Sequence, residues 1–492
     1  MRRWAWVWLP LAFLVTVMGW ALTSPVGSSP DDDYHLSSIW CAQGTQEGRC
    51  EEVPGDPAAR AVPAAVVQAS DCYRFEASVT AACSVPVLAS DELVPTDRVN
   101  ATAGLYPGGF YWVMSLLVGD DVDRSVAAMR LLNALLATAL LVAVLRLLPA
   151  GLSAAAVLAV TVTFIPLGLS LVPSTNPSSW AIVGIGTYWA LALALLRRRR
   201  WGDRRGVLIT VAAVLAGVMA VASRVDASAY LVIATVVVLT LAGWRRALAV
   251  PGRLAVLLVL CAVAAFTYLS RGEVVAGGTG MGSADPGAGL LLTNLAYLPV
   301  LIQGAVGGWA LGWNDTILPP WVPVAGTLVL GALAYRGLAQ ASRRQLVAAG
   351  LALGALVAVP IGFLQANGLG VGEVVQPRYL LPLLTLLVGV LALGPRLGIP
   401  LPMPIVPGWA IAVGLSVSAV LAFWANAHRY FAGNTVGLFD PKVSPAWIGW
   451  LGVPVWLVAL VVAVSTVALV AGSVMMSVRH QAGTRATASN WL

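Results

Sequence analysis

The sequence predicts an all-α integral membrane protein with about 12 transmembrane helices, joined by outer-face loops and interfacial helices. Of the 492 residues, 59% are apolar and only 10% are charged, whereas an ordinary soluble domain has about a quarter charged residues. This composition excludes a soluble enzyme, a disordered regulator and a small disulfide scaffold. The net charge of +7 does not indicate a nucleic-acid partner, because the basic residues lie in short loops and not on one domain face.

The first apolar run covers residues 4–22 and follows Arg2 and Arg3. We interpret residues 1–23 as an uncleaved first transmembrane helix and not as a signal peptide, because no clean Ala-x-Ala site follows. Residues 126–270 then hold helices 2–7, and residues 321–478 hold helices 8–12. The corresponding apolar runs are 126–147, 151–171, 178–196, 206–222, 227–243, 254–270, 321–338, 345–364, 379–394, 404–424 and 447–472.

Loop charge sets the expected orientation, since loops rich in Lys and Arg stay in the cytoplasm. With the N-terminus inside, 18 of the 29 basic residues are cytoplasmic, and Asp203 is the one acidic residue on that side. Both termini are then cytoplasmic, with residues 479–492 as the tail. Lys442 is the one lysine in the chain, a bias typical of GC-rich bacterial genomes. We therefore expect a multi-pass protein of the bacterial plasma membrane.

Two long segments are expected outside the cell, residues 24–125 and 271–320. The stretches 106–118 and 287–308 are apolar and predict helices that lie in the outer interface. Cysteines at positions 41, 50, 72 and 83 all fall in the first outer loop. Of three connectivities, we favour Cys41–Cys50 with Cys72–Cys83, which closes short loops. A zinc site is the alternative, although the spacings lack the usual C-x2–4-C pattern.

An acidic stretch, Pro30-Asp31-Asp32-Asp33-Tyr34-His35, directly follows the first helix. It is either a solvated turn or a reaction centre. Packed carboxylates raise one another's pKa, which suits a general base. Asp31 and Asp32 would also suit an oxygen-ligated Mn²⁺ or Mg²⁺. A helix starting here would bring His35 beside both of them.

The Pro-Asp-Asp-x-x-His motif resembles that of a family of bacterial polytopic membrane proteins related to the GT-C glycosyltransferases. Three further stretches are similar to the same family, in the same order. Ser174-Thr175-Asn176-Pro177 resembles a Ser-x-Asn-Pro-Asp stretch, with Ser178 in place of the final Asp. Gly312-Trp313-Asn314-Asp315-Thr316 resembles Gly-x-x-Asp-Thr, and Gln376-Pro377-Arg378-Tyr379 resembles Gln-x-Arg-Tyr.

The resemblance implies a GT-C-like fold and a transferase whose donor is a polyprenyl-phosphate sugar. The acceptor would be a cell-envelope glycan or glycolipid, and the extracytoplasmic site would invert the anomeric carbon. Asp31 or Asp32 would be the catalytic base, with His35 beside it. The expected substrate-binding residues are Tyr34, Asn176, Trp313, Asp315, Gln376 and Tyr379. No cofactor is certain, with Mn²⁺ or Mg²⁺ as the metals to test.

Three arginines are candidates for binding the donor phosphate. Arg378 can form a bidentate pair with a lipid phosphate, or it can anchor the helix at the interface. Arg224 can pair with Asp226 as a structural bridge or contact substrate. Arg429 is a secondary phosphate candidate. Trp313 can stack on a sugar ring or serve as an interfacial anchor.

Two other functions remain as alternatives. A carrier or flippase for lipid-linked sugars would place ionisable residues at mid-membrane depth, whereas few charges lie there in this sequence. A non-catalytic envelope assembly factor would use the cysteine-bearing loop to bind a partner. The chain lacks a G-x-x-x-x-G-K-[ST] motif, so ATP-driven transport is not expected.

Overall fold

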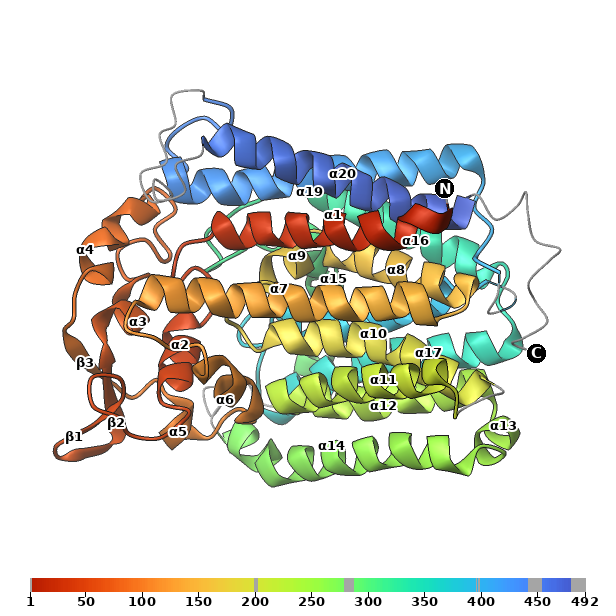
Figure 1. Cartoon of the computed structure of the whole chain (residues 1–492), viewed down its shortest axis with the longest axis horizontal. Coiled ribbons are helices and arrows are strands. Elements are labelled where there is room, and N and C mark those ends of the chain that lie inside the picture. Colours follow the sequence, from red (N-terminus) through yellow and green to blue (C-terminus); the bar gives the residue numbers. More distant parts are fainter. Residues whose placement is uncertain are drawn as a thin grey trace.

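In a computed structural model, long helices run side by side and a smaller loop region covers one end of the bundle (Figure 1). The structure describes residues 2–198, 202–277, 287–394, 396, 399–440 and 454–478. We call the covered end the loop end. The opposite end holds the start of α1 and the arginine-rich turns, and we call it the arginine end.

Ten helices of the described ranges are long and apolar enough to cross a membrane, and three further apolar helices are shorter. Each of the 12 predicted spans overlaps one of these 13 helices, so the prediction of an all-α polytopic membrane protein is confirmed. The ten are α7 (Val122–Leu147), α10 (Ser178–Arg197), α11 (Arg204–Ser223), α12 (Val225–Ala242), α14 (Pro251–Gly277), α15 (Ala288–Gln303) with η2 (Gly304–Gly308), α16 (Trp321–Leu338), α17 (Arg343–Ala366), α19 (Ile405–Ala432) and α20 (Val455–Val478). The shorter three are α1 (Arg2–Leu22), α8 (Ala150–Phe164) and α18 (Pro377–Leu391).

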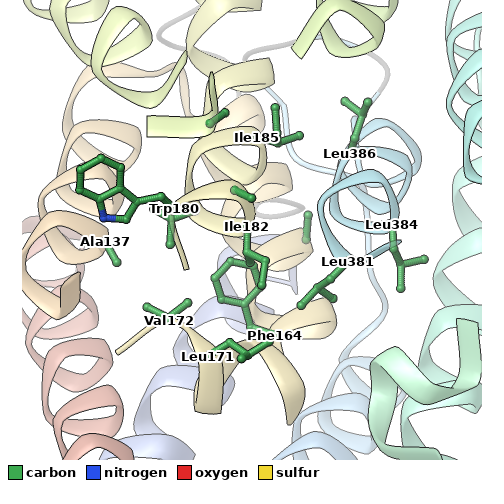
Figure 2. Packing of buried hydrophobic residues seen from close by; sticks show 14 of the residues in the cluster. Ala137, Phe164, Leu171, Val172, Trp180, Ile182, Ile185, Leu381, Leu384 and Leu386 are labelled. Atoms are coloured by element: carbon green, nitrogen blue, oxygen red, sulfur yellow. The ribbon is translucent and has the colours of Figure 1, made fainter. Parts of the chain in front are cut away.

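Helix α10 forms the centre of the bundle, and its membrane-length window is entirely buried. Figure 2 shows its Ile182 and Ile185 among Phe164 of α8 and Leu381 of α18. Gly184 permits close packing of α11, since a Cβ there would lie 2.6 Å from the Ala216 carbonyl oxygen. Such small-residue contacts are a common way for helices to associate within a membrane.

The predicted span 151–171 is divided in two. Helix α8 ends at Phe164, and α9 (Leu167–Leu171) starts after Pro166. Proline lacks the N–H that a continuous helix needs. The break leads the chain into the polar stretch 174–177 at the loop end.

Helix α15 falls in the segment 287–308, where we predicted helix in the outer interface, and it is a single helix followed by η2. It is long enough to span, yet both of its ends contact the loop end. Gln365 Nε2, near the end of α17, donates to the Gly287 carbonyl over 3.1 Å. At the other end, a Cβ on Gly304 would lie 2.4 Å from Cγ of Pro377, the first residue of α18. These contacts favour a helix that lies along the loop end.

The loop region contains a small antiparallel sheet that the all-α prediction lacked. Its strands β1 (Glu51–Val53), β2 (Asp56–Pro63) and β3 (Leu93–Thr96) follow the order β1-β2-β3. Short helices accompany it: α2 (Asp32–Trp40), α3 (Ala64–Gln68), η1 (Ala81–Ser84), α4 (Val85–Leu88), α5 (Asn100–Ala103) and α6 (Gly109–Ser115). β2 is rich in Ala and Pro, which are poor strand formers, so its composition does not predict a strand.

Two disulfides close this region, Cys41–Cys50 and Cys72–Cys83. The favoured pairing is confirmed. The zinc alternative is wrong, because all four sulfurs are used in covalent bonds.

Candidate functional site

The acidic turn is held by the polar stretch that follows α9. Asp31 precedes α2 with a φ of 59°, a left-handed conformation that costs a non-glycine residue roughly 1–2 kcal/mol. Asn176 Nδ2 donates to the Pro30 carbonyl over 2.8 Å, and Thr175 Oγ1 donates to Asp32 Oδ1 over 2.8 Å. Two of the motifs therefore meet, and Asn176 positions the turn.

The three adjacent carboxylates have different surroundings. Asp32 is fully buried and accepts hydrogen bonds from the Ser29 N–H and from Thr175. Burial raises its pKa to about 6. Asp33 is buried, and its two carboxylate oxygens accept hydrogen bonds from Nε and Nη2 of Arg98 over 2.6 and 3.1 Å. The turn is therefore not simply a solvated one.

Asp31 is the accessible carboxylate of the three, with 37% of its side chain exposed. Its Oδ2 accepts a 2.5 Å hydrogen bond from Arg378 Nη2 at the start of α18. Burial is the largest single influence on this carboxyl and raises its pKa, but the nearby charges, that of Arg378 first among them, and the Arg378 hydrogen bond together outweigh burial, so the pKa is lowered. The motifs around residues 31 and 378 thus form one ion pair.

Arg224 joins the same site. It forms the expected bridge to Asp226, with Nε and Nη2 at 2.8 and 3.0 Å from the carboxylate oxygens. Its guanidinium also lies 4.1 Å from the ring centroid of Tyr379, and that of Arg378 lies 5.0 Å from the same ring. Arg224 can therefore form its structural bridge to Asp226 and still lie where it could contact a substrate. Gln376 is the residue that precedes α18.

His35 is fully buried one turn along α2 from Asp31, as the sequence predicted for a helix starting here. Its Nδ1 lies 2.9 Å from the Tyr111 hydroxyl, and the Tyr106 ring is 5.2 Å away. Burial lowers the pKa of His35 to about 3, so the ring is neutral. Tyr34 Oη donates to Asn100 Oδ1 over 3.0 Å.

Sequence reasoning missed Tyr106 and Tyr111. Tyr106 contacts Arg224 as well as His35, with 5.6 Å between its ring centroid and the guanidinium. The sequence offered one signal: both tyrosines belong to the apolar segment 106–118, which we predicted to be a helix in the outer interface.

Around this site, four buried polar atoms have no hydrogen-bond partner among the residues that the structure describes: Nε and Nη1 of Arg378, Nη1 of Arg224 and Nε2 of His35. Buried donors normally find partners, so each of these atoms needs an explanation. We call Asp31, His35, Arg224, Arg378 and Tyr379 the Arg378 cluster. The cluster can supply several N–H donors to an anion.

Arg429 and Asp315 lie elsewhere at the loop end and pair with each other over 2.8 Å. Arg429 also donates to the carbonyls of Tyr73, Glu76 and Val79. We call these five residues the Arg429 cluster. Its contacts join the first loop to the end of α19, so we do not assign Arg429 to the phosphate.

Trp313 is buried and donates its indole N–H to the Gly27 carbonyl over 2.8 Å. Its ring packs against Phe75 at 5.5 Å between centroids. These contacts give Trp313 a structural role and leave its ring covered, so it is not placed to stack on a sugar.

The carboxylates do not fit a metal site. The Asp31 and Asp32 oxygens face hydrogen-bond donors that belong to different segments. Within the described ranges, no group of three or more His, Cys, Asp or Glu side chains is placed to hold an ion.

The bundle of long apolar helices with one polar, disulfide-closed end defines a polytopic helical membrane protein. The chain belongs to the family described as a predicted membrane protein, DUF2142, whose model matches residues 13–387. The match includes every member of the Arg378 cluster and ends before Arg429. No curated protein and no solved structure matches the chain.

Proposed function

We propose that this protein is a GT-C-type glycosyltransferase that moves a sugar from a polyprenyl-phosphate donor to a cell-envelope glycan or glycolipid. The observation that carries the proposal is the set of unpartnered donors on Arg224 and Arg378 beside the accessible Asp31 carboxylate. Guanidinium groups bind phosphate oxygens through two parallel hydrogen bonds. A lipid phosphate at the membrane surface would satisfy these donors.

The donor phosphate and Asp31 would compete for Arg378. In the free protein, Arg378 Nη2 binds Asp31 and the charge of the guanidinium lowers the carboxyl pKa. When the donor phosphate accepts hydrogen bonds from Arg378 in place of Asp31, the Asp31 carboxylate loses stabilisation and its pKa rises. Asp31 therefore becomes a stronger base when the donor is bound.

In the chemical step, Asp31 removes the proton of an acceptor hydroxyl. The hydroxyl oxygen forms a bond to the anomeric carbon while the bond from that carbon to the phosphate oxygen breaks. The polyprenyl phosphate leaves with the bonding electrons, and Arg224 and Arg378 stabilise its charge. One displacement inverts the anomeric configuration.

The neutral residues of the site would orient the sugar. His35 keeps Nδ1 on Tyr111 and leaves Nε2 unpartnered for a sugar hydroxyl. Tyr34 directly precedes His35, and Gln376 lies two positions before Arg378; both are further candidates for substrate contact. We favour Asp31 over Asp32 as the base, because Asp32 is fully buried with both oxygens hydrogen-bonded.

The same proposal places the loop end outside the bacterial plasma membrane and both termini in the cytoplasm. Disulfides persist on the oxidising side, and arginine-rich turns stay inside. To test this, one cysteine is introduced at the exposed Ala101 or at Gly202, with Cys261→Ser as the background. Ala101→Cys should react with an impermeant thiol reagent in intact cells, and Gly202→Cys should react only after lysis. The opposite labelling would contradict the placement.

The function is tested by incubating the purified protein with a panel of polyprenyl-phosphate sugars and envelope acceptors. Release of polyprenyl phosphate together with formation of an inverted glycoside supports the proposal. Transport of lipid-linked sugar across liposomes without any bond cleavage would instead indicate a carrier. A protein that does neither but binds an envelope partner would be an assembly factor.

A further inference from the structure

A second site lies at the arginine end, where α12 turns into α13 (Trp244–Leu248). A cavity of about 690 Å³ opens there and is lined by parts of α10, α12, α13 and α17. Ligand sites commonly have about 300–1,000 Å³. The first residue of α12 that lines this cavity is Val236, 12 positions after Arg224 and so roughly 18 Å away along the helix at 1.5 Å per residue. It is therefore distinct from the Arg378 cluster.

Four arginines line the cavity: Arg197, Arg245, Arg246 and Arg344. The described residues of its lining include no acidic side chain. Like charges that converge in one hollow repel one another, so the arrangement favours an anion as occupant.

Capping of helix ends does not use all of these donors. Arg197 Nη2 and Arg344 Nη1 each lie 3.4 Å from a carbonyl at the end of α12, Leu241 and Ala242 respectively. Arg246 Nη2 bonds the Arg197 carbonyl over 2.6 Å. A guanidinium has five N–H groups, and the buried Nε of Arg197 has no partner within the described part of the chain. Donors remain for a ligand.

The remaining wall is apolar and continues into the membrane-length helix. Val236 and Leu239 of α12 line it together with Thr240, whose hydroxyl donates to the Val236 carbonyl over 2.9 Å, and Val236 is 45% exposed. Trp244, 69% exposed, lies at the rim, where an aromatic ring suits the interface between lipid and water. An occupant with both a phosphate and a hydrocarbon chain matches both walls.

We propose that this cavity binds the phosphate headgroup of an anionic phospholipid, with the acyl chain along α12. The arginines provide the charge, since each basic residue beside an anionic lipid surface contributes about 1 kcal/mol. The apolar wall distinguishes a lipid from a free phosphate. The inference is independent of the proposed transferase activity.

The test uses the full-length protein in detergent, titrated by native mass spectrometry with phosphatidylglycerol, phosphatidylcholine of equal chain length, glycerol 1-phosphate and inorganic phosphate. The double variant Arg245→Gln/Arg344→Gln removes two lining charges. Arg204→Gln/Arg343→Gln is the matched control, because both of these arginines are exposed at the same end and do not line the cavity. Thr240→Trp places a bulky ring on the α12 side of the cavity and keeps every charge.

Phosphatidylglycerol should bind more tightly than phosphatidylcholine and both soluble phosphates. The lining variant should weaken phosphatidylglycerol binding about 25-fold, because each arginine accounts for about fivefold. The control should change it less than about threefold, and Thr240→Trp should also weaken it. The proposed site would be overturned if both double variants lost the same affinity for phosphatidylglycerol. It would also be overturned if Thr240→Trp bound phosphatidylglycerol as tightly as wild type. Equally tight binding of glycerol 1-phosphate would overturn the lipid assignment.

Discussion

The Arg378 and Arg429 clusters both pair a buried arginine with an aspartate from a distant segment. They differ in how completely the guanidinium is used. The two terminal nitrogens of Arg429 share four acceptors, and among the described residues only its Nε lacks a partner. Arg378 donates from Nη2 alone and leaves Nε and Nη1 unpartnered. A buried ion pair is therefore weak evidence of function, whereas several unpartnered donors beside it indicate a missing ligand.

The acceptors of the two clusters explain the difference. Arg429 bonds three carbonyls that all lie within the Cys72–Cys83 disulfide loop, so it fixes that loop to α19. Arg378 instead contacts the partly exposed side chain of Asp31. One cluster holds the fold, and the other can exchange its partner for a ligand.

The largest expected effect is on turnover. Asp31→Asn keeps the shape of the turn and removes the base, so the rate of transfer should fall about 10²–10⁴-fold. Donor affinity should not fall, because the released Arg378 is free to bind phosphate. Single-turnover kinetics with a titrated donor separate the two quantities. Unchanged turnover would remove the chemical distinction between the clusters.

Arg429→Gln should reduce stability and leave the chemistry intact. It leaves Asp315 buried without its cation, and breaking such a pair costs about 3–5 kcal/mol. Thermal unfolding in detergent measures the loss. The double variant Asp315→Asn/Arg429→Gln should recover part of it, since no unpaired charge remains. If Arg429→Gln were as stable as wild type but had a low turnover rate, Arg429 would belong to the active site.

Asp32 should affect stability with a definite pH dependence. Burial raises its pKa to about 6 from 3.8, so the folded state favours the protonated carboxyl. This contribution is fully present below about pH 3.8 and is lost as the pH rises through about 6, a change of about 3 kcal/mol. The melting temperature of wild type should fall relative to Asp32→Asn over this window. A pH-independent difference would contradict the buried carboxyl.

The smallest effect is expected at Tyr379. Both guanidinium groups of the Arg378 cluster lie over its ring, and a cation–π contact contributes about 0.5–2 kcal/mol. Tyr379→Leu should weaken donor binding roughly 2- to 30-fold. Tyr430→Leu is the matched control, because that ring lies 5.4 Å from the Arg429 guanidinium. Equal losses in both variants would remove the distinction between the two rings.

Hydropathy predicted the helices well because the interior of a bilayer leaves a chain few options. Every backbone polar group in hydrocarbon must be satisfied within the protein, so long apolar runs become helices. The disulfides followed from the short spacings of the four cysteines. The small sheet was missed because Ala- and Pro-rich strands have no distinctive pattern.

The candidate site was predictable residue by residue but not as an arrangement. The motifs at Asp31, Asn176 and Arg378 were found, yet their contacts join segments up to 347 positions apart, which spacing cannot reveal. The same limit explains why Trp313 and Arg429 were predicted to contact substrate. Both occupy polar loop positions in the sequence, and only tertiary contacts show that they are buried structural residues.

The central claim is that the Arg378 cluster receives a lipid phosphate. The most direct measurement is the dissociation constant of polyprenyl phosphate for wild type, Arg378→Ala, Arg378→Lys and Arg429→Gln, each corrected for its folded fraction. We predict that Arg378→Ala weakens binding roughly 10- to 100-fold, as expected for loss of hydrogen bonds from a charged group. Lysine should restore only part of the affinity because it lacks the bidentate geometry, and Arg429→Gln should bind like wild type. Unchanged affinity in Arg378→Ala, with the loss appearing in Arg429→Gln, would contradict the account.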